Sequence, residues 1–284
     1  MIKNSLEPFV KWAGGKRQLI PEIMKRLPVK YNNYYEPFIG GGALFFHLLP
    51  ERAIINDINK ELVNTYRQIK NNVEELLKNL ENIDASIYGD GKEYYYDIRD
   101  KFNHKIKKNE TDVEQAAMFL FLNKHCFNGL YRVNSEGLFN VPFNGKTGKT
   151  FDKEHIVEIH HKIQQTVVLE GDFEKACSEA KKGDFLFFDS PYAPLNPSSF
   201  ESYTKEGFNV ENHIRLSRLF DELTRKGCYC MLTNHNTPFI NDLYKNKGYK
   251  MDVVSVKRLI NSDAKNRKGE EVIIYNYDLE DIRE

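Results

Sequence analysis

Cysteine, tryptophan and long apolar runs are scarce in this sequence of 284 residues, which holds four cysteines and one tryptophan. So few cysteines do not make the disulfide framework of a small secreted protein. No stretch approaches the roughly 20 apolar residues of a membrane-spanning helix, and the first residues lack the apolar core of a signal peptide. The sequence therefore predicts a cytoplasmic protein with no membrane partner.

Signatures of metal binding are also missing. Cys228 and Cys230 alternate in a strand-like stretch without a second ligand pair at zinc spacing, so packing on one strand face explains them better. His160 and His161 lie five and six positions after His155 in a helical stretch, which is poor geometry for a shared metal. We expect no metal.

Charge of neither sign dominates, because the formal net charge is +0, which neither favours nor excludes a nucleic acid as partner. The distribution is uneven, however. Residues 101–149 carry eight Lys/Arg against four acids, and residues 257–269 carry five against one, a local excess of +4 in each stretch. Each stretch is either a solvated face or a surface that follows a phosphate backbone.

The spacing of apolar residues predicts an α/β fold. Strand-like runs at residues 34–38 and 53–57 flank a glycine turn and a helix start, which is the pattern of a βαβ unit. After residue 166 the alternation of strands and helices returns, with a helix predicted at residues 212–225. Further strands are predicted at residues 167–172, 185–189, 228–233, 253–254 and 272–277.

The middle of the chain has a different pattern. Residues 61–124 follow a 3.6-residue helical period, and residues 128–143 alternate around Ser135-Glu136-Gly137 as a β-hairpin does. We therefore expect two domains. Residues 1–60 plus 165–284 would form the α/β sheet, and residues 61–164 would form a helical insertion that carries the hairpin.

A glycine turn and an acid follow the first two predicted strands. Gly40, Gly41 and Gly42 let the backbone approach a ligand closely, and the next helix offers unpaired N–H groups. Asp57, at the end of the second strand, can accept hydrogen bonds from both hydroxyls of a ribose. Because no complete G-x-G-x-x-G pattern is present, a single nucleoside is favoured over a dinucleotide.

The most informative segment is Asp189-Ser190-Pro191-Tyr192, which directly follows the apolar run of residues 185–188. A carboxylate, a backbone carbonyl and an aromatic ring at the end of a buried strand suit a flat heterocycle that carries an amino group. Taken alone, such a tetrapeptide is more often an ordinary turn. Residues 11–16 leave a similar choice, since Trp12 could pack in the core or contact a ligand.

Together these segments resemble the D12 class (Dam type) of DNA adenine-N6 methyltransferases, in family order along nearly the whole chain. The likeness is greatest to the modification enzymes of DpnII/MboI-like restriction systems, which act at GATC. Residues 11–16 match the family motif K-W-x-G-G-K, residues 36–42 match E-P-F-x-G-G-G, and residues 55–59 match I-N-D-x-N. Residues 127–134 match F-N-G-L-x-R-x-N, and residues 139–142 match F-N-V-P. Residues 189–192 match D-P-P-Y, with Ser190 in place of the first proline.

The resemblance implies a Rossmann-like sheet that binds S-adenosylmethionine as the methyl donor, with the helical insertion recognising double-stranded DNA as its target. It also admits a cognate restriction endonuclease as a partner. By position, the implied cofactor-binding residues are Trp12, Lys16, Phe38, Gly40, Gly42, Asp57, Asp172, Phe173 and Asp189.

The resemblance further implies a catalytic role for Asp189, Ser190, Pro191 and Tyr192. A target adenine must leave the duplex to be reached. Tyr192 would then stack on the flipped base, while Asp189 and the carbonyl of Ser190 accept the two amino hydrogens. Serine keeps that carbonyl but adds an N–H group and freer rotation, compared with the proline usual in the family.

The hairpin would read the DNA sequence. Arg132 can bind a guanine through two hydrogen bonds in the major groove, and Leu130 can contact a thymine methyl group. Phe127 and Asn128 would fill the gap left by the flipped base. Further expected contacts are Pro142 behind the far strand, Lys146 at a phosphate, and Phe200, Tyr203 and Thr204 beside the target base. Lys257, Arg258 and residues 265–268 form either a phosphate-contacting loop or a solvated one.

The sequence therefore predicts an adenine-N6 methyltransferase that acts at GATC as the modification part of a restriction system. Three alternatives stay open: another site such as GATATC, adenine in RNA, or a DNA-binding protein without catalysis in which Ser190 marks a decayed pocket. The last is disfavoured because Trp12, Lys16 and Asp57 are all intact.

Overall fold

A computed structural model describes residues 6–12, 14, 18–86, 91–195, 207–257 and 268–279. Several residues singled out in the sequence lie outside the described residues: Lys16, Phe200, Tyr203, Thr204 and most of the basic stretch 257–269. Within the described ranges, no helix has both the length and the apolar composition that crossing a membrane requires.

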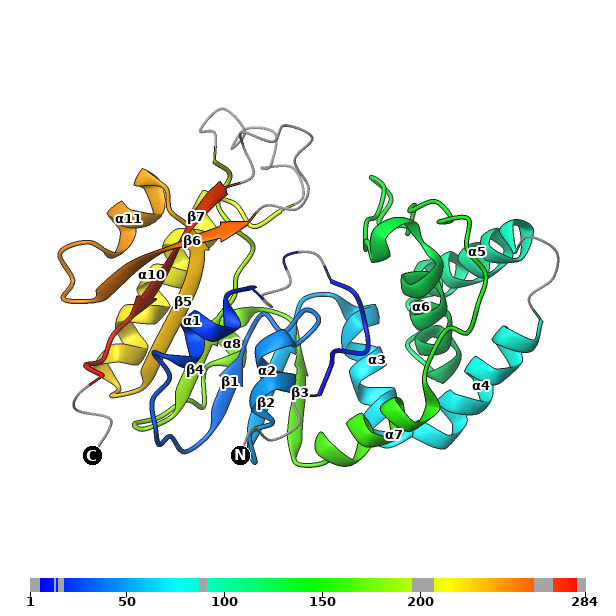
Figure 1. Ribbon diagram of the computed structural model, residues 1–284, viewed down its shortest axis with the longest axis horizontal. Coiled ribbons are helices and arrows are strands. Elements are labelled where there is room, and N and C mark those ends of the chain that lie inside the picture. Colours follow the sequence, from blue (N-terminus) through cyan, green and yellow to red (C-terminus); the bar gives the residue numbers. More distant parts are fainter. Residues whose placement is uncertain are drawn as a thin grey trace. The chain divides into compact units, whose positions relative to one another are not determined.

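One seven-stranded sheet organises the fold (Figure 1). Its strands are β1 Tyr34–Glu36, β2 Ala53–Asp57, β3 Thr166–Glu170, β4 Phe185–Phe188, β5 Tyr229–His235, β6 Lys250–Lys257 and β7 Lys268–Tyr275, in the order β3-β2-β1-β4-β5-β7-β6. β1 is parallel to β2 and β4, β4 is parallel to β5, and β7 is antiparallel to β5 and β6. The first five positions have the order of doubly wound nucleotide-binding sheets, so the predicted Rossmann-like α/β class is confirmed.

The two central strands are buried along their full length. Every residue of β1 and β4 is buried, which explains the uninterrupted apolar run at residues 185–188. β2 begins and ends where predicted, whereas β1 ends two residues early, before Pro37, which cannot donate a ladder hydrogen bond. Because β4 lies beside β1, the strand order reverses there, and the sheet has its topological switch point between these two strands.

The chain forms two compact units. Unit 1 comprises residues 1–15, 39–49 and 56–171, and unit 2 comprises residues 16–38, 50–55 and 172–284. Unit 1 combines residues of both expected domains, whereas unit 2 lies entirely within the expected residues 1–60 plus 165–284, so compactness and the expected domains divide the chain differently. The functional division into a catalytic and a DNA-recognition domain stays a prediction.

Unit 1 is mainly helical, as predicted for residues 61–124. Its helices are α2 Ala43–Leu48, α3 Lys60–Asn71, α4 Val73–Ala85, α5 Lys92–Lys108, α6 Val113–His125 and α7 Lys153–Lys162. α6 packs against α3, α4 and α5 and is buried on nearly all sides, which explains why it is apolar around its circumference. Asn59 and Asp112 accept backbone N–H groups at the starts of α3 and α6, so side chains fix where these helices begin.

The predicted hairpin at residues 128–143 is present as a tight turn with isolated antiparallel bridges instead of two continuous strands. A 3-10 turn, Phe127–Gly129, opens the segment. The predicted tip is confirmed, because the N–H of Gly137 donates to the carbonyl of Asn134 at 2.9 Å. The Asn134 side chain also accepts two backbone N–H groups in the tip, which replaces part of a strand ladder with local bonds.

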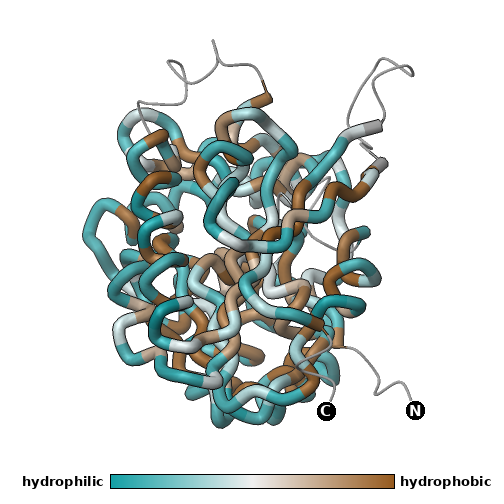
Figure 2. The backbone as a smooth tube through the Cα atoms, turned by 90° about the vertical axis from the view of Figure 1, so that its left-hand side faces the viewer, coloured by the Kyte–Doolittle hydropathy of each residue, from teal (hydrophilic) through white to brown (hydrophobic). Residues whose placement is uncertain are grey.

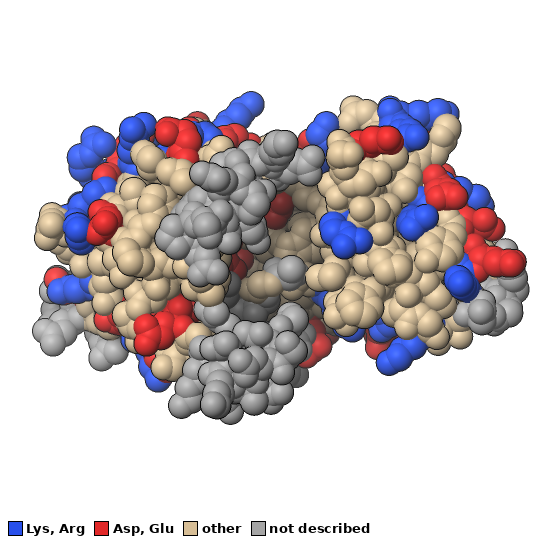
Figure 3. All heavy atoms as spheres, turned by 90° about the horizontal axis from the view of Figure 1, so that it is seen from above, with Lys and Arg blue, Asp and Glu red and all other residues tan. Residues whose placement is uncertain are grey.

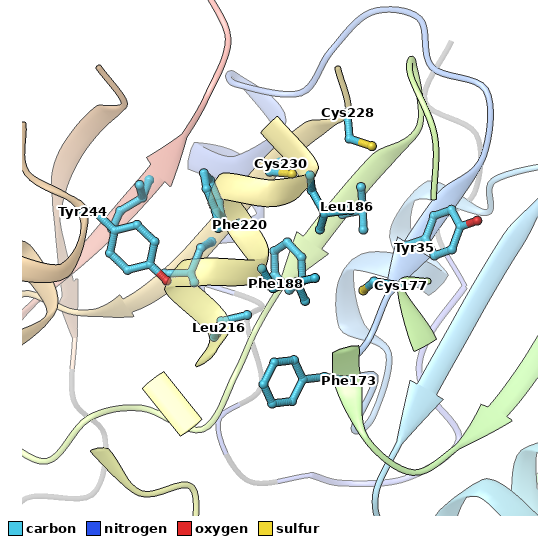
Figure 4. Packing of buried hydrophobic residues seen from close by; sticks show 14 of the residues in the cluster. Tyr35, Phe173, Cys177, Leu186, Phe188, Leu216, Phe220, Cys228, Cys230 and Tyr244 are labelled. Atoms are coloured by element: carbon cyan, nitrogen blue, oxygen red, sulfur yellow. The ribbon is translucent and has the colours of Figure 1, made fainter. Parts of the chain in front are cut away.

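The core of unit 2 forms where α10 packs on the sheet. The helices of this unit are α1 Ile20–Met24, α8 Phe173–Ala176, α10 Val210–Arg225 and α11 Pro238–Tyr244. Phe188 of β4 clusters with Leu216 and Phe220 of α10 (Figure 4). Cys228 and Cys230 belong to the same buried cluster, which confirms that they serve packing. Figure 2 shows apolar segments (brown) inside the fold and hydrophilic turns (teal) outside.

His213 on α10 is a buried histidine whose protonation opposes folding. Its ring meets the rings of Phe208 and Phe239 edge-on, at centroid distances of 4.8 and 5.7 Å, and its Nε2 atom has no hydrogen-bond partner among the described residues. Burial lowers the pKa of His213 to about 4. An unfolded histidine titrates near 6.5. Between these values the unfolded chain binds a proton that the folded chain does not, so the free energy of unfolding falls as the pH drops.

We predict that His213→Leu weakens this pH dependence. Between pH 7 and pH 5 the free energy of unfolding should fall by about 2 kcal/mol less than in the parent protein. Urea unfolding at the two pH values measures the difference, and His161→Leu on the exposed side of α7 is the control. Equal pH slopes in parent and His213→Leu would contradict the assignment.

Candidate functional site

Asp189 directly follows β4, at the switch point of the sheet, where ligands bind in folds of this kind. Its Oδ1 atom accepts a hydrogen bond of 3.0 Å from the hydroxyl of Thr233 on β5. Thr233 is fully buried, so this bond holds the carboxylate in one orientation. A carboxylate has about four lone-pair positions, so Asp189 can also accept a hydrogen from an amino group of a ligand.

Asn234, also buried on β5, holds the residues after Asp189. Its Oδ1 atom accepts the N–H of Ala193 at 2.9 Å, and its Nδ2 atom donates to the hydroxyl of Ser190 at 3.4 Å. Ser190 is 2% exposed, so its hydroxyl needs such a partner. The serine in place of the usual proline therefore leaves no unsatisfied hydroxyl in the core.

Tyr192 is held at both its ring and its hydroxyl. The hydroxyl donates to Oε2 of Glu271 on β7 at 2.8 Å, and the ring meets the His235 ring edge-on at a centroid distance of 4.8 Å. Burial, reinforced by the negative charges of Asp189 and Glu271, raises the pKa of Tyr192 well above its ordinary value. The phenol therefore stays neutral and its ring is oriented.

The sequence did not identify three of these supporting residues: Thr233, Asn234 and Glu271. A signal for the first two exists, because they are polar residues that follow the apolar part of β5 beside the end of β4. Glu271 gives no such signal, since its place depends on the antiparallel pairing of β7 with β5.

Unit 2 also brings together Phe38, Asp172 and Phe173, three of the residues implied for cofactor binding. The ring centroids of Phe38 and Phe173 are 5.2 Å apart. Arg215 on α10 donates to both carboxylate oxygens of Asp172 at 2.9 Å, and its guanidinium lies 4.9 Å from the centre of the Phe173 ring. Arg215, which the sequence did not single out, therefore holds both residues in place.

Asp57 closes the glycine turn in unit 1. Its Oδ2 atom accepts the N–H of Gly40 at 2.9 Å, and its Oδ1 atom accepts the N–H of Asn59 at 3.0 Å. Burial raises the pKa of Asp57, while these two backbone hydrogen bonds oppose the rise. The carboxylate is half-buried and each oxygen has a second lone pair, so it can accept both hydroxyls of a ribose.

Gly40 and Gly42 are required by packing inside the protein. Both have left-handed backbones, with φ of 46° and 71°. A Cβ atom on Gly40 would lie 2.7 Å from Cδ1 of Trp12, and one on Gly42 would lie 2.8 Å from the Tyr66 hydroxyl. The turn therefore lies directly against the half-buried Trp12 ring, so Trp12, Gly40, Gly42 and Asp57 come together in unit 1.

The hairpin residues expected to contact DNA also lie in unit 1, mostly at the surface. Phe127 is 53% exposed, and Asn128 beside it is exposed with a left-handed φ of 57°. Arg132 is exposed, and its Nε atom donates to Oδ1 of Asn140 at 2.8 Å, so an amide that the sequence did not identify orients the guanidinium. Pro142 and Lys146 are exposed, and Leu130 is half-buried.

The basic excess of residues 101–149 is only partly a surface feature. Lys105 is paired with Asp112 and Glu114 at 2.7 and 2.8 Å, with only 12% of its side chain exposed, so it stabilises the helices of unit 1. Figure 3 shows Lys and Arg interspersed with Asp and Glu over the visible face. Any phosphate contact of this stretch therefore rests on individual cations such as Lys146.

The sequence pattern of the D12 class N6 adenine-specific DNA methyltransferase family matches residues 12–261. The Type II methyltransferase M1.LlaDCHI of Lactococcus lactis subsp. cremoris is 44% identical over 280 residues, which cover 97% of each chain. The Type II methyltransferase M.MjaIII of Methanocaldococcus jannaschii is 41% identical over 290 residues, covering 96% of this chain and 99% of the relative. The DNA adenine methylase of Haemophilus influenzae is 35% identical over 262 residues, covering 92% and 90%.

We predict that Gly40→Ala destabilises the protein through its contact with Trp12. The left-handed backbone alone should cost roughly 1–2 kcal/mol, and the overlap of the new methyl group with the indole should add roughly 1–3 kcal/mol. Gly137→Ala is the matched control, because Gly137 has φ of 75° with nothing within 4 Å of a Cβ atom.

Chemical unfolding measures both losses. Trp12 is the only tryptophan of the chain, so its fluorescence should shift in Gly40→Ala and not in Gly137→Ala. The packing argument is wrong if the two variants lose equal stability with unchanged emission.

Proposed function

Because this chain belongs to the D12 class of N6 adenine-specific DNA methyltransferases, we propose that it methylates the adenine of GATC in double-stranded DNA. We further propose that it is the modification enzyme of a restriction system, with a cognate endonuclease as partner. Two relatives that share more than two fifths of its residues bear the name Type II methyltransferase, which supports this role.

The observation that carries the choice of duplex DNA is the exposed turn of unit 1. Phe127 and Asn128 project from it, and Arg132 follows with its guanidinium oriented by Asn140. An exposed ring beside an amide can fill the space of a base that has left the stack, and an oriented guanidinium can bind a guanine edge. Leu130 between them would contact a thymine methyl group, and Lys146 a phosphate.

The cofactor proposed is S-adenosylmethionine, which supplies a methyl group on a positively charged sulfonium when bound. Asp57 would accept the ribose hydroxyls, because both of its oxygens are fixed by backbone N–H groups and retain lone pairs. Phe38 and Phe173 offer aromatic faces for an adenine ring, with Asp172 held beside them by Arg215. Trp12, Gly40, Gly42 and Asp189 complete the proposed set, together with Lys16, which lies outside the described residues.

The proposed catalytic role of Asp189 follows from its fixed carboxylate. A flipped adenine costs a few kcal/mol of stacking and pairing, part of which Tyr192 would recover by stacking on the base. Asp189 and the carbonyl of Ser190 would accept the two hydrogens of the amino group. These bonds direct the nitrogen lone pair out of the ring plane and stabilise the positive charge that develops on nitrogen during transfer. Pro191 disfavours the helical conformation for Ser190, which restricts the direction of the Ser190 carbonyl.

Transfer of labelled methyl to matched DNA duplexes tests this function. We expect incorporation into a duplex with GATC, and none into duplexes with GATATC or a scrambled site or into an RNA of the same sequence. Asp189→Ala should lower the rate roughly 100- to 1,000-fold. Asp242→Ala, at a carboxylate whose side chain is 62% exposed on α11, should have the parent rate.

The outcomes separate the alternatives. Incorporation confined to the GATATC duplex or to RNA would keep the enzyme class and overturn the proposed target. A near-normal rate of Asp189→Ala would overturn its catalytic role. Binding of cofactor and DNA without any transfer would support the non-catalytic alternative.

We predict that Arg132→Ala relaxes discrimination at one base pair of the site by roughly 1–3 kcal/mol. Lys146→Ala is the matched control, because loss of a phosphate contact should weaken binding to all duplexes alike and lower the salt dependence by about one counterion. Rates and affinities on a set of singly substituted GATC duplexes measure both effects. A uniform loss over all duplexes for Arg132→Ala would make it a backbone contact.

A further inference from the structure

Tyr131 lies within the exposed turn of unit 1, between Leu130 and Arg132, yet its ring points into the protein. It stacks on Trp12 with a centroid distance of 5.7 Å and an interplanar angle of 24°. The rings of Phe119 and Phe139 contact it at 5.7 and 5.6 Å. Trp12 in turn lies against the backbone of Gly40, so one aromatic contact separates the glycine turn from the turn that carries Arg132.

The hydroxyl of Tyr131 makes a second connection. It donates to Oε2 of Glu61 at 3.0 Å, in the first turn of α3. Asn59 caps the start of that helix, and its N–H donates to Asp57. Burial and the charge of Glu61 raise the pKa of Tyr131, so the hydroxyl keeps its proton. Tyr131 is therefore linked to Asp57 in two ways. Its ring packs on Trp12, which contacts Gly40, and its hydroxyl bonds to α3, whose capping residue is Asn59. Gly40 and Asn59 both donate to Asp57.

The main chains of the two segments are joined separately. The buried Asn123 accepts the N–H of Lys11 at 2.9 Å and donates to the carbonyls of Lys11 and Gly129 at 2.9 and 3.1 Å. Gly129 is so close that a Cβ atom would lie 2.5 Å from Cβ of Lys11. Because Asn123 fixes the backbones, a change at Tyr131 alters the side-chain contact while this junction persists.

We infer that Tyr131 is a positioning residue that couples binding of the cofactor to binding of the target DNA. A ligand that orders Trp12 and Asp57 also orders Tyr131, and the same side chain belongs to the turn that reads DNA. The first ligand bears the entropy cost of ordering Tyr131, so the second ligand binds without that cost. This is positive cooperativity. The coupling is reciprocal, so each ligand raises the affinity of the other by the same factor. This inference rests on the proposed function.

Affinity for S-adenosylhomocysteine, which lacks a transferable methyl group, is to be measured by calorimetry without and with a saturating GATC duplex. In the parent protein we expect the duplex to raise this affinity by a factor of roughly 5–150. Tyr131→Leu should bring the factor to within about twofold of one, and Tyr131→Phe, which keeps the ring and loses only the hydroxyl, should bring it to an intermediate value. Each ligand alone should still bind.

Tyr94→Phe is the matched control. Tyr94 also lies in unit 1 and loses a hydroxyl that donates to the carbonyl of Ile83 at 3.0 Å, away from Trp12. It should keep the parent factor. A parent factor of one, or a factor unchanged in both Tyr131 variants, would overturn the coupling and leave the proposed function intact. If Tyr131→Leu does not fold, Tyr131→Phe decides alone. A parent protein that binds neither ligand would instead overturn the proposed function.

Discussion

Complete burial of β1 and β4 is the constraint on which the candidate site depends. A parallel strand that is covered on both faces carries a polar side chain only where that side chain has a partner, so β4 is apolar throughout and polar chemistry begins where it ends. Asp189 is the first residue after such a strand, and its position follows from the pairing of β4 with β5. Thr233 and Asn234 are buried beside it, and buried polar groups need partners. The bonds that satisfy them are those that orient the loop, so stability and site geometry rest on the same interactions.

In unit 1 the candidate site depends on close packing at two glycines, not on a buried strand. Gly40 accommodates an indole ring, Gly129 accommodates the chain at Lys11, and the backbone at both positions is left-handed. Neither position tolerates a side chain without movement of its neighbour. The glycines therefore serve internal contacts first. A ligand at this turn would bind against Trp12 and Asp57.

Much of the fold could be predicted from local pattern, because burial imposes a period on the sequence. β2 and the helical region of unit 1 follow directly, and Asp57 and Asp189 are recognisable as acids at the ends of apolar runs. The sequence predicts a hairpin of two strands at residues 128–143, whereas the structure has only isolated bridges there. The side chain of Asn134 accepts backbone N–H groups that would otherwise be free to pair between strands. Glu271, Arg215, Asn140 and Glu61 could not be found in this way. Their roles arise from partners 8 to 79 positions away, which only the folded chain brings together.

Ser190 illustrates why a motif can change at one position without losing its arrangement. Proline at this position would restrict the chain through its own ring. Here the restriction comes from outside: Pro191 disfavours the helical conformation for Ser190, and Asn234 fixes the chain at Ala193. The Ser190 hydroxyl is paired with Asn234, which avoids the cost of about 1–3 kcal/mol for an unsatisfied buried group. In the proposed function the motif supplies a carbonyl in a defined direction, and the neighbours of residue 190 would restrict that direction whether or not residue 190 is proline.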